Sequence, residues 1–273
     1  MNLQSPSLTP EVDLAEAEQL FSVRGLRVYL PGGYGAIGEA TALTMGRMGA
    51  VVAVAGPRID KAEALAARIT DTGGTAHGLY VDAREVSSIL QATNEAVARM
   101  GGIDVLVNCV GIQREQKLME VTEEAFDDVY RTNLKSAMFI AQSVARDQIA
   151  RGRGGRQIHL LSVRSQLALR NRGYSAYCAT KGGLAMLVKQ HAMELAPHNI
   201  TVNGVAPTFI QSDRIRSHLE NPEFREFMLE RNPLGRIGNP IEVVGQVIAL
   251  SAPAGNYITG QIVYIDGGVT ASQ

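Results

Sequence analysis

The stretch P-G-G-Y-G-A-I-G at Pro31–Gly38 directly follows the apolar run L-R-V-Y-L at Leu26–Leu30. Apolar residues recur at helical spacing from Ala36 to Met48. A buried strand that enters a helix through glycines can hold a phosphate. Glycine lets backbone N–H groups come close to the ligand, and the helix N-terminus attracts an anion. The same glycines also fit a tight turn that binds nothing.

The loop contains two overlapping glycine patterns. Gly33, Gly35 and Gly38 spell a literal G-x-G-x-x-G, whereas Gly32, Ala36 and Gly38 spell a wider pattern whose middle glycine is replaced. The loop alone does not decide between them, so the choice depends on residues elsewhere in the chain.

Short apolar runs alternate with helix-periodic segments along the rest of the chain. Strands that are apolar throughout are buried on both faces, and strand–helix alternation produces parallel crossovers. We therefore expect an α/β fold, a Rossmann-type doubly wound sheet of about seven parallel strands with helices on both faces. The expected strands are L-R-V-Y-L, V-V-A-V-A, G-L-Y-V, D-V-L-V-N-C-V, Q-I-H-L-L-S-V, I-T-V-N-G-V-A and I-V-Y-I, and the expected helices cover 36–48, 61–69, 86–100, 122–150 and 175–195.

We expect the chain to divide into an N-terminal extension at 1–20 and a single domain at 21–273. The extension has a helix start at Thr9-Pro10-Glu11 and helical character to about Leu20. The segment 208–236 contains helical pieces at 215–219 and 223–230, each next to an Asn-Pro pair. Ligands of open α/β sheets bind beyond the carboxyl ends of the strands, so this segment is expected to form a substrate lid.

Composition narrows the function classes. The 273 residues carry a formal net charge of −1, which argues against a nucleic-acid binder. No apolar run approaches the ~20 residues of a membrane span, and the N-terminus lacks the order of an export signal. Cys109 and Cys178 are expected to be buried free thiols, with no disulfide and no metal site, which fits a reducing cytoplasm.

The segment Y-C-A-T-K places Tyr177 and Lys181 four residues apart on one face of a predicted helix. A tyrosine with its ordinary pKa near 10 is a poor base at neutral pH, but a nearby ammonium favours the phenolate. The pair is therefore a candidate for general acid–base catalysis. Such pairs also arise by chance on helices, so the surrounding motifs decide its meaning.

From about Phe21 to Gly268 the chain resembles the short-chain dehydrogenase/reductase family. The ordered set of motifs carries this resemblance, since each motif alone is unremarkable. The matching elements are P-G-G-Y-G-A-I-G, Asp82 in Y-V-D-A, N-C-V-G, Asn133 in T-N-L-K, Ser162 in L-L-S-V, Y-C-A-T-K, V-N-G-V-A-P and I-D-G-G.

The resemblance implies catalytic roles for four residues. Tyr177 would exchange the proton at the reacting oxygen, Lys181 would lower the tyrosine pKa and bind the nicotinamide ribose, and Ser162 would hold the substrate oxygen. Ser162 lies fifteen residues before Tyr177, which is longer than the commonest family spacing, so Ser165 is a rival. Asn133 would hold a water for proton relay, or its amide would only cap a local helix kink.

The resemblance also implies a dinucleotide cofactor and the wider glycine pattern. Pro31 and Ala36 stand where the family usually has threonine and glycine, and Gly35 would restore freedom to the turn. Asp82 would contact the adenine. The cofactor-binding set comprises Gly32, Tyr34, Gly35, Ala36, Ile37, Gly38, Arg58, Asp82, Ala83, Asn108, Val110, Gly111, Tyr177, Lys181, Pro207, Phe209 and Ile210.

The end of the second expected strand indicates the choice between NADP and NAD. An acidic residue there would bind the ribose 2′-hydroxyl and repel a 2′-phosphate. This chain has Gly56 instead, followed by Pro57 and Arg58. The missing acid and the nearby arginine favour NADP, with NAD as the alternative.

Within the family, G-I-Q-R, S-V-R-S-Q-L-A-L and N-P-E-F are most similar to gluconate 5-dehydrogenases and related sugar-acid or polyol enzymes. This implies a small-molecule substrate such as gluconate or 5-ketogluconate. Ser162, Tyr177 and an arginine, Arg114 or Arg164, would bind it. The alternatives are a 3-oxoacyl-carrier-protein reductase and a non-catalytic dinucleotide sensor. The family resemblance also implies a homotetramer.

Overall fold

The computed structural model describes residues 14–212 and 220–271. Its seven strands form one parallel sheet in the order β3-β2-β1-β4-β5-β6-β7. This confirms the predicted doubly wound sheet. The strands are β1 (Arg27–Pro31), β2 (Val51–Gly56), β3 (Thr75–Tyr80), β4 (Val105–Asn108), β5 (Gly155–Leu160), β6 (Ile200–Pro207) and β7 (Ile262–Ile265).

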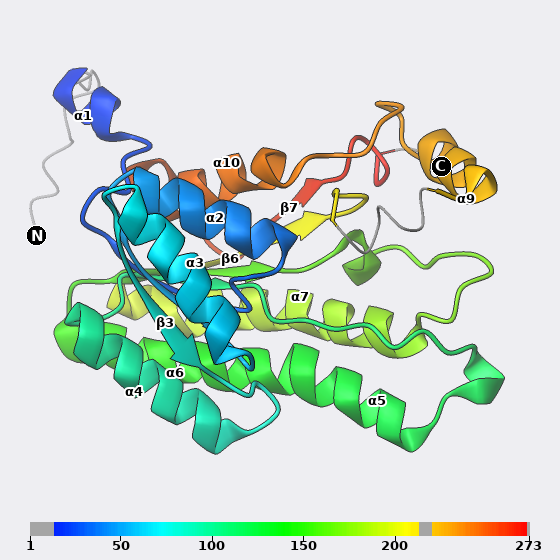
Figure 1. Ribbon diagram of the computed structural model, residues 1–273, viewed down its shortest axis with the longest axis horizontal. Helices are drawn as coiled ribbons and strands as arrows, with labels where there is room; N and C mark the ends of the chain where they lie inside the picture. The colour runs from blue at the N-terminus through cyan, green and yellow to red at the C-terminus, as the bar shows by residue number, and fades with distance from the viewer. Residues whose placement is uncertain (1–13, 213–219, 272–273) are drawn as a thin grey trace, which may run out of the picture.

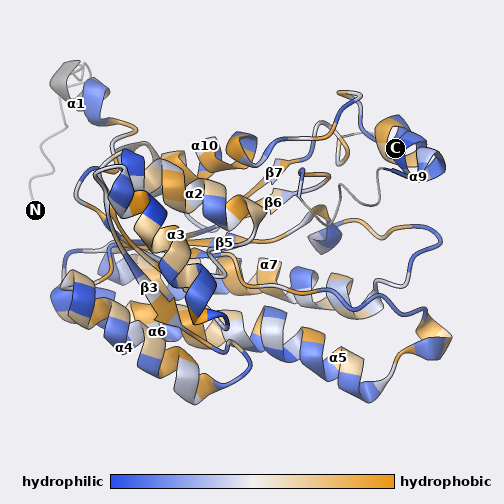
Figure 2. Cartoon of the chain, in the orientation of Figure 1, coloured by the Kyte–Doolittle hydropathy of each residue, from blue (hydrophilic) through white to orange (hydrophobic). Residues whose placement is uncertain are grey.

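Helices cover both faces of the sheet (Figure 1). One layer consists of α2 (Ala36–Arg47), α3 (Ile59–Asp71) and α10 (Pro240–Ser251), and the other of α4 (Val86–Met100), α6 (Ser136–Arg151) and α7 (Ser175–Leu195). Hydrophobic residues dominate the strands and alternate with hydrophilic residues along the helices (Figure 2). Neighbouring side chains of a strand point to opposite faces, so Val28 and Leu30 join the core under α2 and α10, whereas Tyr29 joins the core under α4 and α6.

The order of the strands reverses between β1 and β4. From β1 the chain adds β2 and β3 on one side, and from β4 it adds β5, β6 and β7 on the other. At such a point the loops beyond the strands turn to opposite faces and leave a crevice. The glycine loop follows β1, and the N-C-V-G segment follows β4. The fold therefore brings these two motifs together at one edge of the sheet.

The predicted helix at 122–150 is interrupted. It comprises α5 (Glu123–Tyr130), a π-helical turn at Arg131–Lys135, and α6. Thr122 caps its start by accepting a hydrogen bond from the Ala125 N–H. π-Helical turns are rare in proteins overall, and those that occur are often found at functional sites. Asn133 lies within this turn.

One helix was missing from the sequence-based expectation. Helix α10 begins with a capping box and has Pro240 at its first position. The Asn239 side chain accepts a hydrogen bond from the Ile241 N–H, and the Glu242 side chain accepts one from the Asn239 N–H. The sequence N-P-I-E is a recognisable start signal for such a helix.

The proposed lid lies partly outside the described residues. The predicted helix at 215–219 and the predicted helix start at Thr9-Pro10-Glu11 lie outside the described residues. The predicted helical piece at 223–230 corresponds to α9 (Pro222–Glu230). Helix α9 lies at one end of the molecule, and α1 (Leu14–Gln19) lies at the opposite end (Figure 1). No helix within 14–212 or 220–271 is long and apolar enough to span a membrane.

Candidate active site

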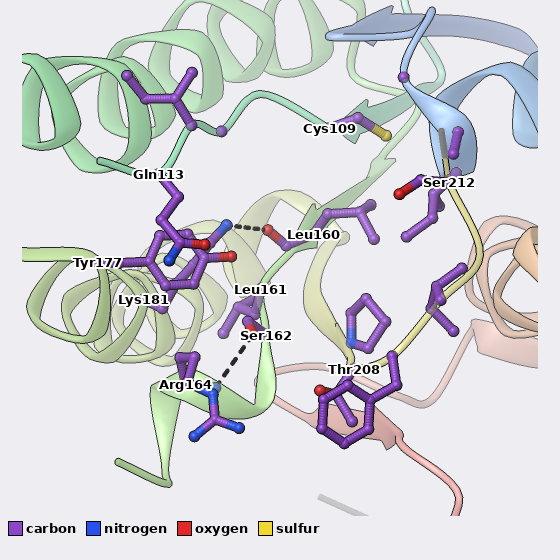
Figure 3. Close-up of a pocket in the computed structure, with 18 of the residues that line it drawn as sticks. Cys109, Gln113, Leu160, Leu161, Ser162, Arg164, Tyr177, Lys181, Thr208 and Ser212 are labelled. Carbon is purple, nitrogen blue, oxygen red and sulfur yellow. Dashed lines mark hydrogen bonds between the residues drawn. The ribbon is translucent and has the colours of Figure 1, made fainter. Parts of the chain in front are cut away.

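A cavity of about 420 Å³ lies beyond the carboxyl ends of β1, β4, β5 and β6. Figure 3 shows residues that line it, with Tyr177 and Lys181 on α7, Leu160 at the end of β5 and Ser162 shortly after it. Fourteen of the predicted site residues line it: Gly32, Gly35, Ala36, Ile37, Gly38, Val110, Gly111, Ser162, Arg164, Tyr177, Lys181, Pro207, Phe209 and Ile210.

The glycine loop shows which glycines its shape requires. Gly32 has φ +75°, and a Cβ on it would lie 2.6 Å from the backbone carbon of Cys109. A Cβ on Gly38 would lie 2.8 Å from the Gly32 carbonyl oxygen, and one on Gly33 would lie 2.7 Å from the Leu30 carbonyl oxygen. Gly32 and Gly38 therefore let the loop pass close to the β4 end, while Gly33 allows packing against β1.

Gly35 does not have the role expected for it. Its φ is −78°, an ordinary value for any residue, and a Cβ there would meet nothing closer than 3.8 Å. The turn therefore needs no extra freedom at this position. Ala36 begins α2 directly after it, so its methyl group is accommodated at the first turn of the helix. Of the three glycines in the literal G-x-G-x-x-G, the close packing of the loop requires Gly33 and Gly38 but not Gly35.

Lys181 is buried beside Tyr177. The lysine is 3% exposed, its Nζ donates a hydrogen bond to the Leu160 carbonyl at 2.8 Å, and it lies 5.7 Å from the centre of the Tyr177 ring. Burial lowers the pKa of Lys181 to about 8. One helical turn separates the two side chains on α7, and the Leu160 carbonyl at the end of β5 fixes the ammonium next to the tyrosine.

The structure distinguishes the two candidate serines. Ser162 lines the cavity, and its Oγ accepts a hydrogen bond from the Arg164 N–H at 3.2 Å. Ser165 does not line this cavity. Its hydroxyl donates to the Ser162 carbonyl at 2.7 Å and lies 3.3 Å from the Tyr264 hydroxyl. Ser162 thus faces the same space as Tyr177, whereas Ser165 supports the turn beneath it.

The Asn133 side chain is fully engaged with the protein. Its Oδ1 accepts the Ile112 N–H at 2.7 Å, and its Nδ2 donates to the Ile112 carbonyl at 2.9 Å and to the Thr180 hydroxyl at 3.2 Å. The amide therefore ties the π-helical turn to the loop after β4 and to α7. All three partners lie outside the helix, so the amide does not cap the turn itself, and the water relay stays a prediction.

Five cofactor candidates lie outside the cavity, near the ends of β1, β2, β3 and β4: Tyr34, Arg58, Asp82, Ala83 and Asn108. Asp82 binds Arg84 through both carboxylate oxygens at 3.0 and 2.8 Å, and these hydrogen bonds hold the carboxyl pKa below its usual range. Asn108 accepts the Val110 N–H and contacts His159. Asp82 and Asn108 thus shape the loops that border the cavity.

The two candidate substrate arginines have different surroundings. Arg114 is largely exposed, binds Asp128 at 2.9 Å and lies outside the cavity, contrary to the expectation that it faces the substrate. Arg164 lines the cavity and is only 6% exposed. Its Nη1 donates to the Leu167 and Ala168 carbonyls, burial lowers its pKa, and no carboxylate of the described residues forms an ion pair with it.

Gln113 was not singled out from the sequence. It lines the cavity, and its buried Nε2 has no hydrogen-bond partner within the described part of the chain. An unpartnered buried amide is costly and marks a place where a ligand can bind. Its place in the G-I-Q-R segment beside the candidate Arg114 is a signal that could have pointed to it.

An ion pair lies beside the cavity. Arg172 also lines the cavity, and its Nη2 lies 2.5 Å from a carboxylate oxygen of Glu115. The Gln116 N–H donates to the Gly173 carbonyl beside it. These contacts join the loop after β4 to the loop that enters α7. Within the described residues no group of three or more His, Cys, Asp or Glu is arranged to hold a metal.

Comparison with protein families gives one match across most of the chain. The family model described as enoyl-(acyl carrier protein) reductase matches residues 33–270. Gluconate 5-dehydrogenase of Gluconobacter oxydans is 32% identical over 93% of this chain and 98% of its own length. A 3-oxoacyl-(acyl-carrier-protein) reductase of Staphylococcus epidermidis is 37% identical over 85% of this chain and 94% of its own.

Solved structures give the same picture. The crystal structure of a gluconate 5-dehydrogenase from Burkholderia cenocepacia, in complex with NADP and tartrate, superposes with a TM-score of 0.89. It is 33% identical to this chain and covers 94% of it and all of its own chain. The resemblance therefore extends over nearly the whole chain, in sequence and in fold.

Proposed function

The chain belongs to the short-chain dehydrogenase/reductase family of NAD(P)-dependent oxidoreductases, and from this premise we propose that it interconverts a secondary alcohol and a ketone of a sugar acid or polyol. The meeting of Ser162, Tyr177 and Lys181 beside the glycine loop carries this proposal. The bound nicotinamide would supply or accept the hydride, while the protein positions the substrate and handles the proton.

The surroundings of Ser162, Tyr177 and Lys181 support a separate catalytic role for each. Tyr177 exchanges a proton with the reacting oxygen, and Ser162 donates a hydrogen bond to that oxygen. Lys181, held by the Leu160 carbonyl, favours the tyrosine phenolate and binds the nicotinamide ribose. Asn133 fixes the loop that carries Gln113, through its two hydrogen bonds to Ile112.

The glycine loop supports a dinucleotide site. Because Gly32 and Gly38 carry no Cβ, the loop packs closely against the end of β4 and on itself, and α2 begins within it, where a helix N-terminus would hold a diphosphate. No acidic side chain stands at Gly56, and Arg58 follows it. We propose NADP as the cofactor, which also agrees with the NADP bound to the Burkholderia cenocepacia relative.

The cavity wall supports a polar substrate. The Gln113 amide and the Arg164 guanidinium both line it, and both can bind hydroxyl or carboxylate oxygens. The relatives from Gluconobacter oxydans and Burkholderia cenocepacia, both gluconate 5-dehydrogenases, support gluconate and 5-ketogluconate as first candidates. The Staphylococcus epidermidis relative keeps a 3-oxoacyl thioester as a second candidate.

A substrate panel tests the proposal. The purified protein is assayed with NADPH and NADH against 5-ketogluconate, neutral polyhydroxy ketones and a 3-oxoacyl thioester, and in reverse with gluconate and C4–C6 polyols. Turnover of the polyhydroxy compounds, abolished in Tyr177→Phe, is expected. Turnover of the thioester alone would replace the substrate assignment. Cofactor binding with no turnover of any compound would favour a sensor.

We also propose a homotetramer in the cytoplasm. Helices α5, α6 and α7 lie on one face of the sheet and expose large apolar side chains: Phe126, Tyr130, Met138, Met186 and Met193. Such exposed apolar surface suits contacts between subunits. Light scattering coupled to size-exclusion chromatography measures the number of chains, and a monomeric mass would refute the tetramer.

A further inference from the structure

The Tyr34 ring occupies the space next to Gly56. A Cβ built on Gly56 would lie 2.5 Å from Cζ of Tyr34, with two further ring and hydroxyl atoms as close. Gly56 is the last residue of β2, and Tyr34 lies in the glycine loop after the neighbouring strand β1. While the ring lies there, no side chain fits at position 56 unless the tyrosine moves.

Tyr34 also fixes the position of Arg58. The Arg58 backbone N–H donates a hydrogen bond to the Tyr34 hydroxyl oxygen at 2.9 Å. The Arg58 guanidinium carbon lies 5.3 Å from the centre of the Tyr34 ring, within cation–π distance. Arg58 is exposed, and none of the described carboxylates forms an ion pair with it. Its charge is therefore available to an anionic ligand.

The Tyr34 hydroxyl can still donate one hydrogen bond. A phenol has one proton to donate besides the lone pairs that accept hydrogen bonds. Because the oxygen accepts from Arg58, its own proton can be donated to a phosphate oxygen. Tyr34 and Arg58 thus offer a neutral donor and a cation side by side at the end of β2.

We propose that Tyr34 is the residue that determines selectivity for NADP over NAD. It excludes an acidic residue from position 56, positions the Arg58 guanidinium, and presents its hydroxyl to the 2′-phosphate. Arg58 alone does not explain selectivity, because an exposed arginine without the ring beneath it samples many rotamers. The inference rests on the proposed function, and specifically on the proposed use of NADP.

Equilibrium binding tests this role independently of turnover. The dissociation constants of NADPH and NADH are measured by fluorescence titration for the wild type, Tyr34→Phe, Tyr34→Ala, Arg58→Gln, Gly56→Asp and Tyr34→Ala/Gly56→Asp. Thermal unfolding of each variant without cofactor serves as the control for folding. Arg58→Gln measures what the guanidinium charge contributes by itself.

Tyr34→Ala and Arg58→Gln are expected to weaken NADPH about ten- to hundredfold, as expected for a lost charge-assisted hydrogen bond, and to leave NADH nearly unchanged. Tyr34→Phe, which keeps the ring, should lie between Tyr34→Ala and the wild type. Gly56→Asp should weaken both cofactors because Tyr34 occupies its space. The double variant should bind NADH more tightly than Gly56→Asp does.

Two results would overturn the inference. Equal weakening of NADPH and NADH by Tyr34→Ala would show that the ring only packs the loop. A gain in NADH binding from Gly56→Asp alone would show that Tyr34 does not control that position. If the wild type binds neither cofactor or prefers NADH, the proposed use of NADP fails instead, so the two failures are distinguishable.

Discussion

The Nζ atom of Lys181 lies 5.7 Å from the centre of the Tyr177 ring, one helical turn further along α7. The same Nζ donates to the Leu160 carbonyl at the end of β5. The lysine therefore joins the helix that carries the tyrosine to the strand end that precedes Ser162. This arrangement places a buried cation where it favours a phenolate, at a cost in folding stability.

That cost predicts a pH-dependent difference in stability between the wild type and Lys181→Met. The pKa of Lys181 is about 8 in the folded chain, below the ordinary value of 10.5, so the unfolded chain binds more protons between these values. Wild-type stability should therefore rise between pH 8 and 10.5, whereas the variant should lack this rise. At pH 7 the inactive variant should be more stable by about 2 kcal/mol, after the lost hydrogen bond is counted.

Urea unfolding of both proteins at pH 7 and pH 10 measures this difference. Subtracting the two stabilities at each pH removes the titration of groups that both proteins share. A difference that stays constant from pH 7 to 10 would contradict the buried-cation explanation.

Ser162→Ala and Ser165→Ala should separate the substrate-holding serine from the supporting one. Ser162 faces the cavity, so its loss should lower kcat about a hundredfold or more, as for a removed oxyanion donor. Ser165 only braces the turn through the Ser162 carbonyl, so Ser165→Ala should retain most of the activity. Steady-state kinetics with the best substrate of the panel decide this, and the reverse order of effects would reassign the role to Ser165.

Gly32→Ala and Gly35→Ala form a matched pair for the glycine loop. Alanine at position 32 would adopt a left-handed conformation and press against the Cys109 backbone, so a loss of about 2 kcal/mol or more is expected. Alanine at position 35 would have φ −78° and no neighbour closer than 3.8 Å, so its effect should stay within about 0.5 kcal/mol. Thermal unfolding without cofactor measures both. Equal destabilisation would mean that the loop is strained at Gly35 as well.

Arg164→Lys and Arg114→Lys test which arginine binds a substrate carboxylate. Lysine keeps the charge but not the planar fork, so Arg164→Lys should raise KM for 5-ketogluconate about tenfold and leave KM for a neutral polyhydroxy ketone nearly unchanged. Arg114→Lys should change neither, since Arg114 binds Asp128 outside the cavity. Equal losses for both substrates in Arg164→Lys would mean that the arginine only supports its loop.

Asp104→Ala should destabilise the edge of the sheet opposite the site. Asp104 accepts hydrogen bonds from Arg27 at 2.6 and 2.7 Å and from Arg151 at 3.1 Å. Burial opposes ionisation, but these bonds outweigh it and lower the Asp104 pKa. The stabilisation is present above the unfolded pKa and is lost as pH falls through the folded one. We expect a loss of about 2 kcal/mol at pH 7 that shrinks below about pH 4.

Urea unfolding at pH 7 and pH 3.5 measures this loss. Glu95→Ala is the control, because its partner Arg99 lies on the same helix and the pair is exposed. Such a pair contributes little, so a similar loss in both variants would argue against a special role for Asp104.

The sheet and the helix face of Tyr177 and Lys181 could be predicted because both depend on local patterns. Apolar strands such as Val51–Gly56 need burial on both faces, and a spacing of four residues on a helix puts two side chains together whatever the rest of the chain does. Helix α10 was missed although its capping signal at Asn239–Glu242 is just as local.

The identity of the side chains that face the cavity could not be predicted in the same way. Ser162 and Ser165, or Arg114 and Arg164, differ in how a short 3₁₀ turn or an irregular loop directs their side chains, and neither segment is long enough to show a periodicity in the sequence. The Asn133 amide likewise forms hydrogen bonds with Ile112 and Thr180, which are distant from it in the sequence.

The sequence by itself determined the parallel sheet, the glycine loop at its switch point and the Tyr177–Lys181 pair, because strand burial and helical spacing are encoded residue by residue. Only the tertiary structure decided that Tyr34 fills the space at Gly56, that Gln113 faces the cavity and that Arg164 is buried there without an ion pair to any described carboxylate. Those relationships arise where loops from different strands meet, and the distances between such loops are set by packing across the whole sheet.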